Sequence, residues 1–310
     1  MGPLHCTIRD GSGHPAGVPW AMSNAPSPVS PLTARKTWRT VEPLHGMVYF
    51  APEAAESYGR LGLEGQSGYF ASRSAPMGAV SAGTVVATFF NFRPSLVGES
   101  MEGVWAKVAP AEVLDARQRA AGAALRRMLG PAADSDDVAT AADLAARAAL
   151  RAGERTEGRP LFAGHADLPW PDEPLKRLWH AQTLLREFRG DGHIAQLVHH
   201  GIAGIDALVL HEATGELPVS FLRQTRGWTA GEWGQAAGRL RERGWLNPSG
   251  PDGRNTLSQE GVAVRQDIEE ATDRLAVFAY EAIGEEGCDA LRGLARPLSR
   301  AVVDASGLGT

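Results

Sequence analysis

Apolar and small side chains recur every three or four positions over most of the chain from Val41 onward. This spacing places them on one face of an α-helix, whereas a half-buried strand would show strict alternation. The pattern is clearest in residues 52–62, 81–92, 94–108, 114–130 and 136–153. The sequence therefore predicts a mainly α fold.

The stretch between Gly215 and Gly261 has the order of a winged helix-turn-helix. A short helix is expected in residues 216–227, and a longer recognition helix in residues 229–244. The apolar and small residues of the longer helix recur at helical spacing: Trp233, Ala236, Ala237 and Leu240. We expect this face to pack onto the rest of the domain.

Local capping signals mark the ends of the longer helix. Thr229 and Glu232 have the spacing of a capping box, and Gly244 stands where a left-handed residue ends a helix. Residues 245–246 and 256–257 then flank a turn-rich segment, which predicts a small two-stranded wing. A further helix is expected to begin at Ser258.

The segments RLRERGWL and LSQEGVAVRQDIEEATDRL, on either side of this wing, resemble the MarR-like winged-helix superfamily. A wider set from Val41 to the C-terminus resembles a group of actinobacterial proteins with a MarR-like C-terminal half. The segments that carry this second resemblance are VEPLHGMVYFAPEA, GYFASRSAPMG, TFFNFRPSLV, LWHAQTLLREFRGDGHIAQLV and ALVLHEATG. The resemblance implies a fold and no particular chemistry.

Composition divides the chain into four parts. Residues 1–40 are rich in Gly, Pro and Ser, which favours a disordered leader. Residues 41–157 are expected to form a helical N-terminal domain, which could be a helix-turn-helix without a wing. Residues 158–174, rich in Pro and Gly, are expected to be a linker, and residues 175–310 the MarR-like domain.

The order of features in the two halves is compatible with an internal duplication. His45 and Arg93 in the first half correspond to His180 and Thr229 in the second, at offsets of 135 and 136 residues. Each half then has a short helix followed by a longer one. If the duplication is real, the chain is a pseudo-dimer with a cleft between its halves.

Charge and cysteine content exclude several classes of protein. The net charge of −5 does not favour a nonspecific nucleic-acid binder or a protein of anionic membranes. No apolar run approaches the length of a membrane span, so we expect a cytoplasmic protein. Cys6 and Cys288 have no nearby thiol partner, which argues against a disulfide framework or a CxxC zinc site.

Six of the nine histidines lie in the predicted helices, and they are the strongest candidates for chemistry. We predict His45, His180 and His193 as catalytic residues. The same three with His200 are predicted as ligands if iron, another divalent metal or haem is bound, since imidazole nitrogens suit such centres. Two other interpretations stay open: each histidine could satisfy backbone groups, or one or two could act as acid and base without a metal.

Several aromatic residues have polar neighbours, which is typical of a ligand pocket. The predicted ligand contacts are Tyr49, Tyr69, Arg73, Asn91, Trp179 and His211. Such a pocket would suit a planar molecule that is anionic or phenolic. No phosphate-binding loop is present, so no nucleotide cofactor is expected.

Two functions compete. The MarR-like resemblance implies a dimeric, ligand-responsive regulator that binds DNA, with Arg239, Arg243 and Arg254 as its contacts. Against it, the start of the recognition helix offers Glu232 where phosphates would repel a carboxylate. We therefore favour a repurposed scaffold: a small-molecule-binding protein or an acid–base or metal-dependent enzyme of specialised metabolism, with a histidine-lined pocket between its halves.

Overall fold

A computed structural model describes residues 28–216, 218–250 and 253–306, and its fold is mainly helical. In the first half the helices are α1 (Pro31–Gly46), α2 (Pro52–Gly59), α3 (Gln66–Ser74), α4 (Ala82–Phe89), α5 (Pro94–Met101), α6 (Val104–Lys107), α7 (Pro110–Leu129) and α8 (Asp136–Ala152). In the second half they are α9 (Pro160–Ala166), α10 (Pro174–His199), α11 (Gly204–Glu212), α12 (Val219–Arg226), α13 (Ala230–Glu242), α14 (Gln259–Tyr280) and α15 (Gly284–Ser306). Short 3₁₀ turns are η1 (Met47–Tyr49), η2 (Ala75–Met77) and η3 (Gly130–Asp134).

Two expected boundaries differ from the structure. Helix α1 begins at Pro31, inside the expected leader, because Ser30 caps it and Pro31 occupies the first helical turn. Residues 1–27 of that leader lie outside the described residues. Helix α9 lies inside the expected linker.

Helix α10 also continues through Gly190-Asp191-Gly192, where we expected a turn. A Cβ on Gly192 would lie 3.5 Å from Leu275 of α14, an ordinary van der Waals distance, and α10 packs closely on both α8 and α14. Tertiary packing outweighs the low helix propensity of glycine here.

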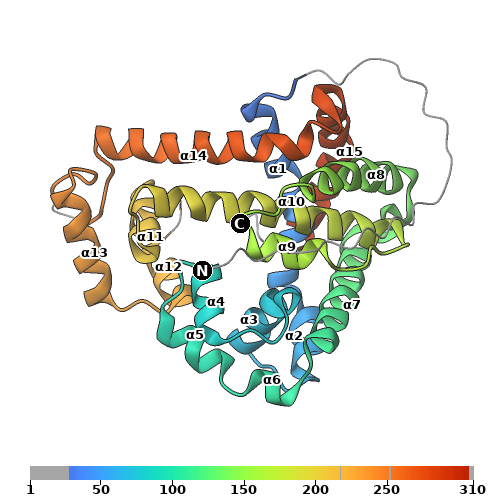
Figure 1. Ribbon diagram of the computed structural model, residues 1–310, viewed down its shortest axis with the longest axis horizontal. Coiled ribbons are helices and arrows are strands. Elements are labelled where there is room, and N and C mark those ends of the chain that lie inside the picture. Colours follow the sequence, from blue (N-terminus) through green and yellow to red (C-terminus); the bar gives the residue numbers. More distant parts are fainter. Residues whose placement is uncertain (1–27, 217, 251–252, 307–310) are drawn as a thin grey trace, which may run out of the picture.

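The molecule has two hydrophobic cores, and they do not follow the expected domain boundary. The first core runs from Val29 to Phe188 and continues from Phe278 to Val302. The second core is made by residues between Leu197 and Ile268. Helices α10 and α14 run side by side and contribute one end to each core (Figure 1). Helix α15 therefore packs with the first half and not with the helix-turn-helix.

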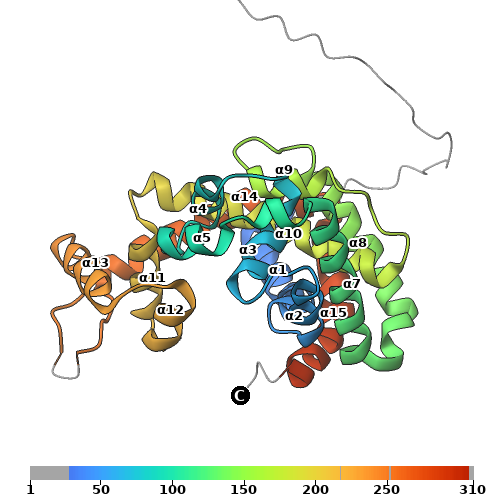
Figure 2. The same ribbon diagram turned by 90° about the horizontal axis from the view of Figure 1, so that it is seen from below.

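Helices α11, α12 and α13 form the helix-turn-helix at one end of the molecule (Figure 2). The capping box is present: Glu232 N donates to Thr229 Oγ1 at 3.2 Å, and Thr229 N donates to Glu232 Oε2 at 3.0 Å. Gly244 has φ +76°, as expected for a left-handed helix end, and Ser258 caps α14. These local predictions are confirmed.

The two-stranded wing is not confirmed. Within the described residues no strand is present, and the antiparallel pairing reduces to one bridge between Leu246 and Leu257. Asn247 N donates to Thr256 O, which closes the hairpin next to that bridge. Residues 251–252, at the expected tip, lie outside the described part of the chain.

Helix α1 packs on α15, α2 packs on α7, and α10 packs on both α8 and α14. Helices α1 and α10 also contact one another. None of the helices described is long and apolar enough to cross a membrane.

The start of α11 presses directly on the first half. A Cβ on Gly204 would lie 2.0 Å from Phe90 O and 2.9 Å from Asn91 Cα, so only glycine fits without a backbone shift. We expect Gly204→Ala to lower the free energy of unfolding by ~1–3 kcal/mol through overpacking. Urea unfolding of the variant and the wild type measures this difference in free energy. Gly293→Ala is the control, since no atom lies within 4 Å of its Cβ position. Equal stabilities of the two variants would contradict this packing.

Candidate functional site

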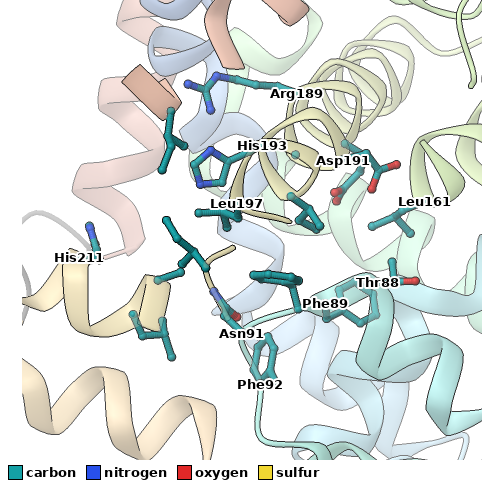
Figure 3. A pocket seen from close by; sticks show the side chains of 18 of the residues that line it. Thr88, Phe89, Asn91, Phe92, Leu161, Arg189, Asp191, His193, Leu197 and His211 are labelled. Atoms are coloured by element: carbon teal, nitrogen blue, oxygen red, sulfur yellow. The ribbon is translucent and has the colours of Figure 1, made fainter. Parts of the chain in front are cut away.

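A cavity of about 440 Å³ lies where the two halves meet. Its walls come from α3, α4 and the turn after α4 in the first half, and from α9 to α12 and α14 in the second. Figure 3 shows aromatic side chains at its lower side and His193 above them. The volume is within the range of small-molecule sites.

The turn between α4 and α5 forms one wall and has a strained backbone. Phe90 has φ +49°, the only such value at a non-glycine residue in the described chain, and Asn91 N donates to Phe89 O at 2.6 Å. This three-residue γ-turn is rare and costly. It sends Phe89 and Phe92 into the first core while Phe90 packs against the second. This strained turn therefore places side chains in both cores, on either side of the cavity wall that it forms.

A buried ion pair lies at one end of the cavity. Arg73 Nη2 donates to Glu187 Oε1 at 3.1 Å, and Arg186 Nη1 donates to the same oxygen at 3.1 Å. Burial alone would raise the pKa of Glu187, but Arg73 and Arg186 outweigh it and lower the pKa to about 2. Arg186 is also paired with Glu42 through Nε at 2.8 Å.

Tyr69 lies beside this pair and also lines the cavity. Its oxygen accepts a hydrogen bond from Arg73 Nη1 at 2.8 Å. Its own hydrogen has no acceptor among the described residues. Burial would raise the pKa of the phenol, but Arg73 and Arg226 bring it below its ordinary value. Tyr69 is therefore a strong hydrogen-bond donor toward a bound oxygen anion.

Arg226 is a partly buried cation without a carboxylate partner among the described residues. Its guanidinium lies over the Phe92 ring at 4.5 Å, and its Nε is shielded from solvent with no hydrogen-bond partner in the described chain. Burial, followed by repulsion from Arg73 and Arg186, lowers its pKa. Since Glu187 is already shared by Arg73 and Arg186, the site has a surplus of positive charge.

His193 lies on another wall with a fixed tautomer. Thr272 Oγ1 donates to Ile268 O at 2.7 Å, so the same oxygen must accept from His193 Nδ1 at 3.1 Å. Nδ1 therefore carries the hydrogen, and Nε2 carries the lone pair. Burial lowers the pKa of His193, which keeps the ring neutral near pH 7.

Asp191, one helical turn after Glu187, also lines the cavity. Its Oδ2 accepts from Phe162 N at 3.0 Å, at the start of α9. Burial raises the pKa of this carboxyl to about 6. His211 lines the opposite side, and burial lowers its pKa.

Of the residues expected at the site, these line the cavity: Tyr69, Arg73, Asn91, His193 and His211. The others expected there do not line it: His45, Tyr49, Trp179, His180 and His200. Helix packing decides this division, because each of the second set points into a core or along its own helix.

His45 is fully buried and uses both ring nitrogens. Thr183 Oγ1 donates to Trp179 O, so it accepts from His45 Nδ1 at 2.9 Å. Tyr49 then donates its hydroxyl hydrogen to Nε2 at 2.9 Å. Trp179 stacks on the His45 ring with centroids 5.6 Å apart. His45 thus has a structural environment, and burial, followed by Arg186, keeps its pKa well below the ordinary value.

His180 and His200 are also held away from the cavity. His180 is 4% exposed and packs edge-on against Trp170, and burial lowers its pKa to about 4. His200 Nδ1 donates to Gln196 O within its own helix. The expected convergence of His45, His180, His193 and His200 on a metal is not found, since the described residues contain no group of three candidate ligands.

The expected DNA contacts are engaged within the protein. Arg239 Nη2 donates to Asp206 at 2.7 Å, and Arg243 donates to His200 O and Gly201 O. Arg254 also has a partner in the chain.

The start of α13 is occupied as well. Arg93 Nε donates to Glu232 Oε1 at 3.1 Å, and Arg93 N donates to Arg226 O. Trp228 Nε1 donates to Asn91 O at 2.9 Å. The turn after α4 and the turn after α12 therefore pack against each other.

Sequence reasoning missed Arg186, Glu187, Asp191, Arg226 and Glu269. A signal was present in LLREFRGD, where charged residues interrupt an apolar helix at positions that face the core. Buried charges of this kind are rare unless paired, and they mark candidate sites.

The comparison with known families agrees with this architecture. The model of a helix-turn-helix family matches residues 34–309, so the chain belongs to that helix-turn-helix family. No curated protein and no solved structure shows a significant match.

Proposed function

We propose that this protein binds a small molecule in the cavity between its two halves. The observation that carries the proposal is Arg226, a partly buried guanidinium that lines the cavity without a carboxylate partner among the described residues. An anionic group of a ligand would supply the missing charge. The aromatic walls, Tyr69, Phe89 and Phe92, favour a planar ring system. Fused-ring phenols and carboxylates of specialised metabolism have this shape and charge.

We also infer that the chain is an internal duplication of a MarR-like unit. The order α3, α4, α5, α7, α8 repeats as α11, α12, α13, α14, α15, with α1 and α10 in equivalent positions. Equivalent helices pack on equivalent partners, as α1 on α15 and α10 on α8. The ligand cavity then lies at the interface of a pseudo-dimer.

The proposal extends to acid–base chemistry through His193. This imidazole lines the cavity with a neutral ring and a free Nε2 lone pair, whereas His45 and His180 are enclosed elsewhere. The histidines do not form a set that would fit a metal. We therefore favour catalysis by His193 over a metal-dependent reaction.

DNA binding is the second candidate function, and membership of a helix-turn-helix family favours it. The contacts around α13 argue against it. Glu232 at its start is paired with Arg93. The turn after α4 and the turn after α12, which would face successive major grooves, are in contact with each other. A dimeric regulator needs its two units about 34 Å apart. Specific retardation of the DNA upstream of its own gene in a gel shift would revive this function.

Replacement of Arg226 by alanine tests ligand binding. We expect the wild-type protein to bind naphthoate, a planar carboxylate, and Arg226→Ala to weaken this binding by ~10–100-fold, because a hydrogen bond to a charged group contributes ~1.5–3 kcal/mol. Fluorescence titration gives the dissociation constants. Arg274→Ala removes an exposed arginine of α14 and should leave the affinity unchanged. Equal affinities of Arg226→Ala and wild type would contradict the proposal.

A further inference from the structure

We propose that the cavity catalyses proton transfer in a ring-fused, conjugated ketone, with His193 as the base and with Tyr69 and Arg226 as the groups that stabilise the oxygen anion. This inference rests on the proposed function, since it assigns a substrate class and a reaction to the same cavity. It requires three features: a free base, an oxyanion site and a cavity that both of them line.

The base is His193 Nε2. The hydrogen bonds from His193 Nδ1 to Thr272 Oγ1 and from Thr272 to Ile268 O fix the ring hydrogen on Nδ1 and leave the Nε2 lone pair free. The same chain would stabilise the imidazolium that forms when Nε2 takes a proton. Glu269 Oε1 lies 3.9 Å from Nδ1 and would stabilise the same charge. A neutral histidine oriented in this way has the arrangement of a general base.

The oxyanion site is formed by Tyr69 and Arg226. The Tyr69 hydroxyl can donate to a ligand because Arg73 occupies its oxygen as a donor. Arg226 adds a positive charge that nothing described in the chain neutralises by hydrogen bonding. Preorganised donors of this kind favour the state in which negative charge has developed on oxygen.

The cavity suits a bicyclic substrate, because its volume is about 440 Å³ and Tyr69, Arg226 and His193 all line it. Along α10, Glu187 precedes His193 by six residues, and Glu187 holds the Arg73 that donates to Tyr69. The base therefore lies further along α10 than the ion pair beside Tyr69. In a bicyclic enone the carbonyl oxygen lies in one ring and the acidic γ-carbon in the other. The oxygen can therefore approach Tyr69 while the γ-hydrogen approaches His193.

The reaction is balanced without a cofactor. The γ C–H bond breaks, its proton moves to His193 Nε2, and its electron pair passes through the conjugated system to the carbonyl oxygen. The product is a dienolate held by Tyr69 and Arg226. Return of the proton to the same carbon regenerates the ketone, and its return to the α-carbon shifts the double bond. No oxidant or reductant is needed.

The test uses two probes with the full chain. β-Naphthol, a planar phenol that resembles the dienolate, reports binding by its fluorescence. Octalone, a bicyclic conjugated ketone, reports catalysis by incorporation of deuterium at its γ-carbon in D₂O, followed by proton NMR. We expect the wild-type protein to accelerate this exchange and β-naphthol to inhibit it.

Variants identify the groups. We expect His193→Gln to reduce the exchange rate by ~10²–10⁴-fold while β-naphthol still binds. Tyr69→Phe should reduce the exchange rate by ~10²–10³-fold and also weaken the binding of β-naphthol. His200→Gln is the matched control, because this histidine follows the last residue of α10 and lies outside the cavity. Full exchange activity in His193→Gln would overturn the inference.

The pH profile of the unchanged protein gives an independent test if a variant fails to fold. Charged groups around His193 are Glu269 and Arg265 on α14, Arg189 on α10 and, through Glu269, Arg35 on α1. Because burial lowers the pKa of His193, the midpoint of the rise in exchange rate with pH should lie below pH 6.5, and the rate should level off above that midpoint. A rate that still rises in proportion to hydroxide above pH 7 would overturn the assignment of the base.

The outcomes separate the two proposals. If β-naphthol binds with an affinity that depends on Arg226 but octalone exchange is not accelerated, the catalytic inference fails and the binding function stands. If neither β-naphthol nor naphthoate binds, both proposals fail.

Discussion

Glu187→Gln is expected to destabilise the protein by ~3–5 kcal/mol, because removal of one partner from a buried ion pair leaves uncompensated charge in the interior. Glu187 is 4% exposed and holds both Arg73 and Arg186. The amide of glutamine cannot neutralise either guanidinium. Urea unfolding at neutral pH, with the wild type beside it, measures the difference in free energy.

The control for this prediction is Glu56→Gln. Glu56 is paired with Arg60, and both side chains are exposed, so the pair contributes little to stability. If Glu187→Gln unfolded with the same midpoint as Glu56→Gln, the charge pair at the end of the cavity would not have the role described. A mild effect would also remove the argument that Arg226 is the surplus cation.

Acid is expected to destabilise the protein through its buried histidines, before most of its carboxylates are protonated. Burial holds the pKa of His180 at about 4, and burial likewise keeps those of His45 and His165 well below 6.5. A histidine with a lowered pKa in the folded state binds its proton more readily after unfolding. Its contribution to stability is therefore complete above pH 6.5 and falls as the pH decreases toward the folded value. For His180 alone, the difference corresponds to ~3 kcal/mol between pH 6.5 and 4.

One carboxyl opposes this trend. Burial raises the pKa of Asp191 to about 6, so its ionisation costs stability, and that cost is relieved as the pH falls below 6. The pKa of Glu187 is shifted the other way, so its ionised carboxylate stabilises the folded state, and this stabilisation is lost only between pH 4.5 and about 2. Since three buried histidines stand against one such aspartate, we expect a net loss of stability between pH 6.5 and 4.

Urea midpoints measured across this pH range test the expectation. His180→Gln keeps a neutral polar group at the position and should flatten the dependence on pH. His199 is exposed, and His199→Gln should leave the slope unchanged. A wild-type midpoint that stays constant from pH 7 to 4 would show that these histidines are protonated without cost. It would also argue against their burial.

The prediction of local structure from sequence succeeded where short-range chemistry decides the outcome. The cap at Thr229, the left-handed Gly244 and the start of α14 at Ser258 each depend on residues a few positions apart. The prediction failed at Gly190–Gly192, where α10 continues as a helix because its packing on α8 and α14 outweighs the low helix propensity of glycine. It also failed at the wing, where one bridge replaces the expected strands.

The candidate site was predicted only in part. Arg73, Asn91 and His193 were expected at a pocket and line it, whereas His45 and His180 are enclosed in the interior. Both sets lie in helices of similar composition. The difference arises from the face each residue presents after the helices pack, and a spacing along one helix does not fix that face relative to another helix.

The sequence by itself determined the mainly helical fold and the helix-turn-helix in the second half of the chain. Both follow from periodicity and capping signals within one segment. Only the tertiary structure decided that Arg226 remains without a carboxylate while Arg73 and Arg186 share Glu187. It also decided that His193 faces the cavity. The physical reason is that burial and charge pairing depend on contacts between residues more than a hundred positions apart, such as Arg73 with Glu187.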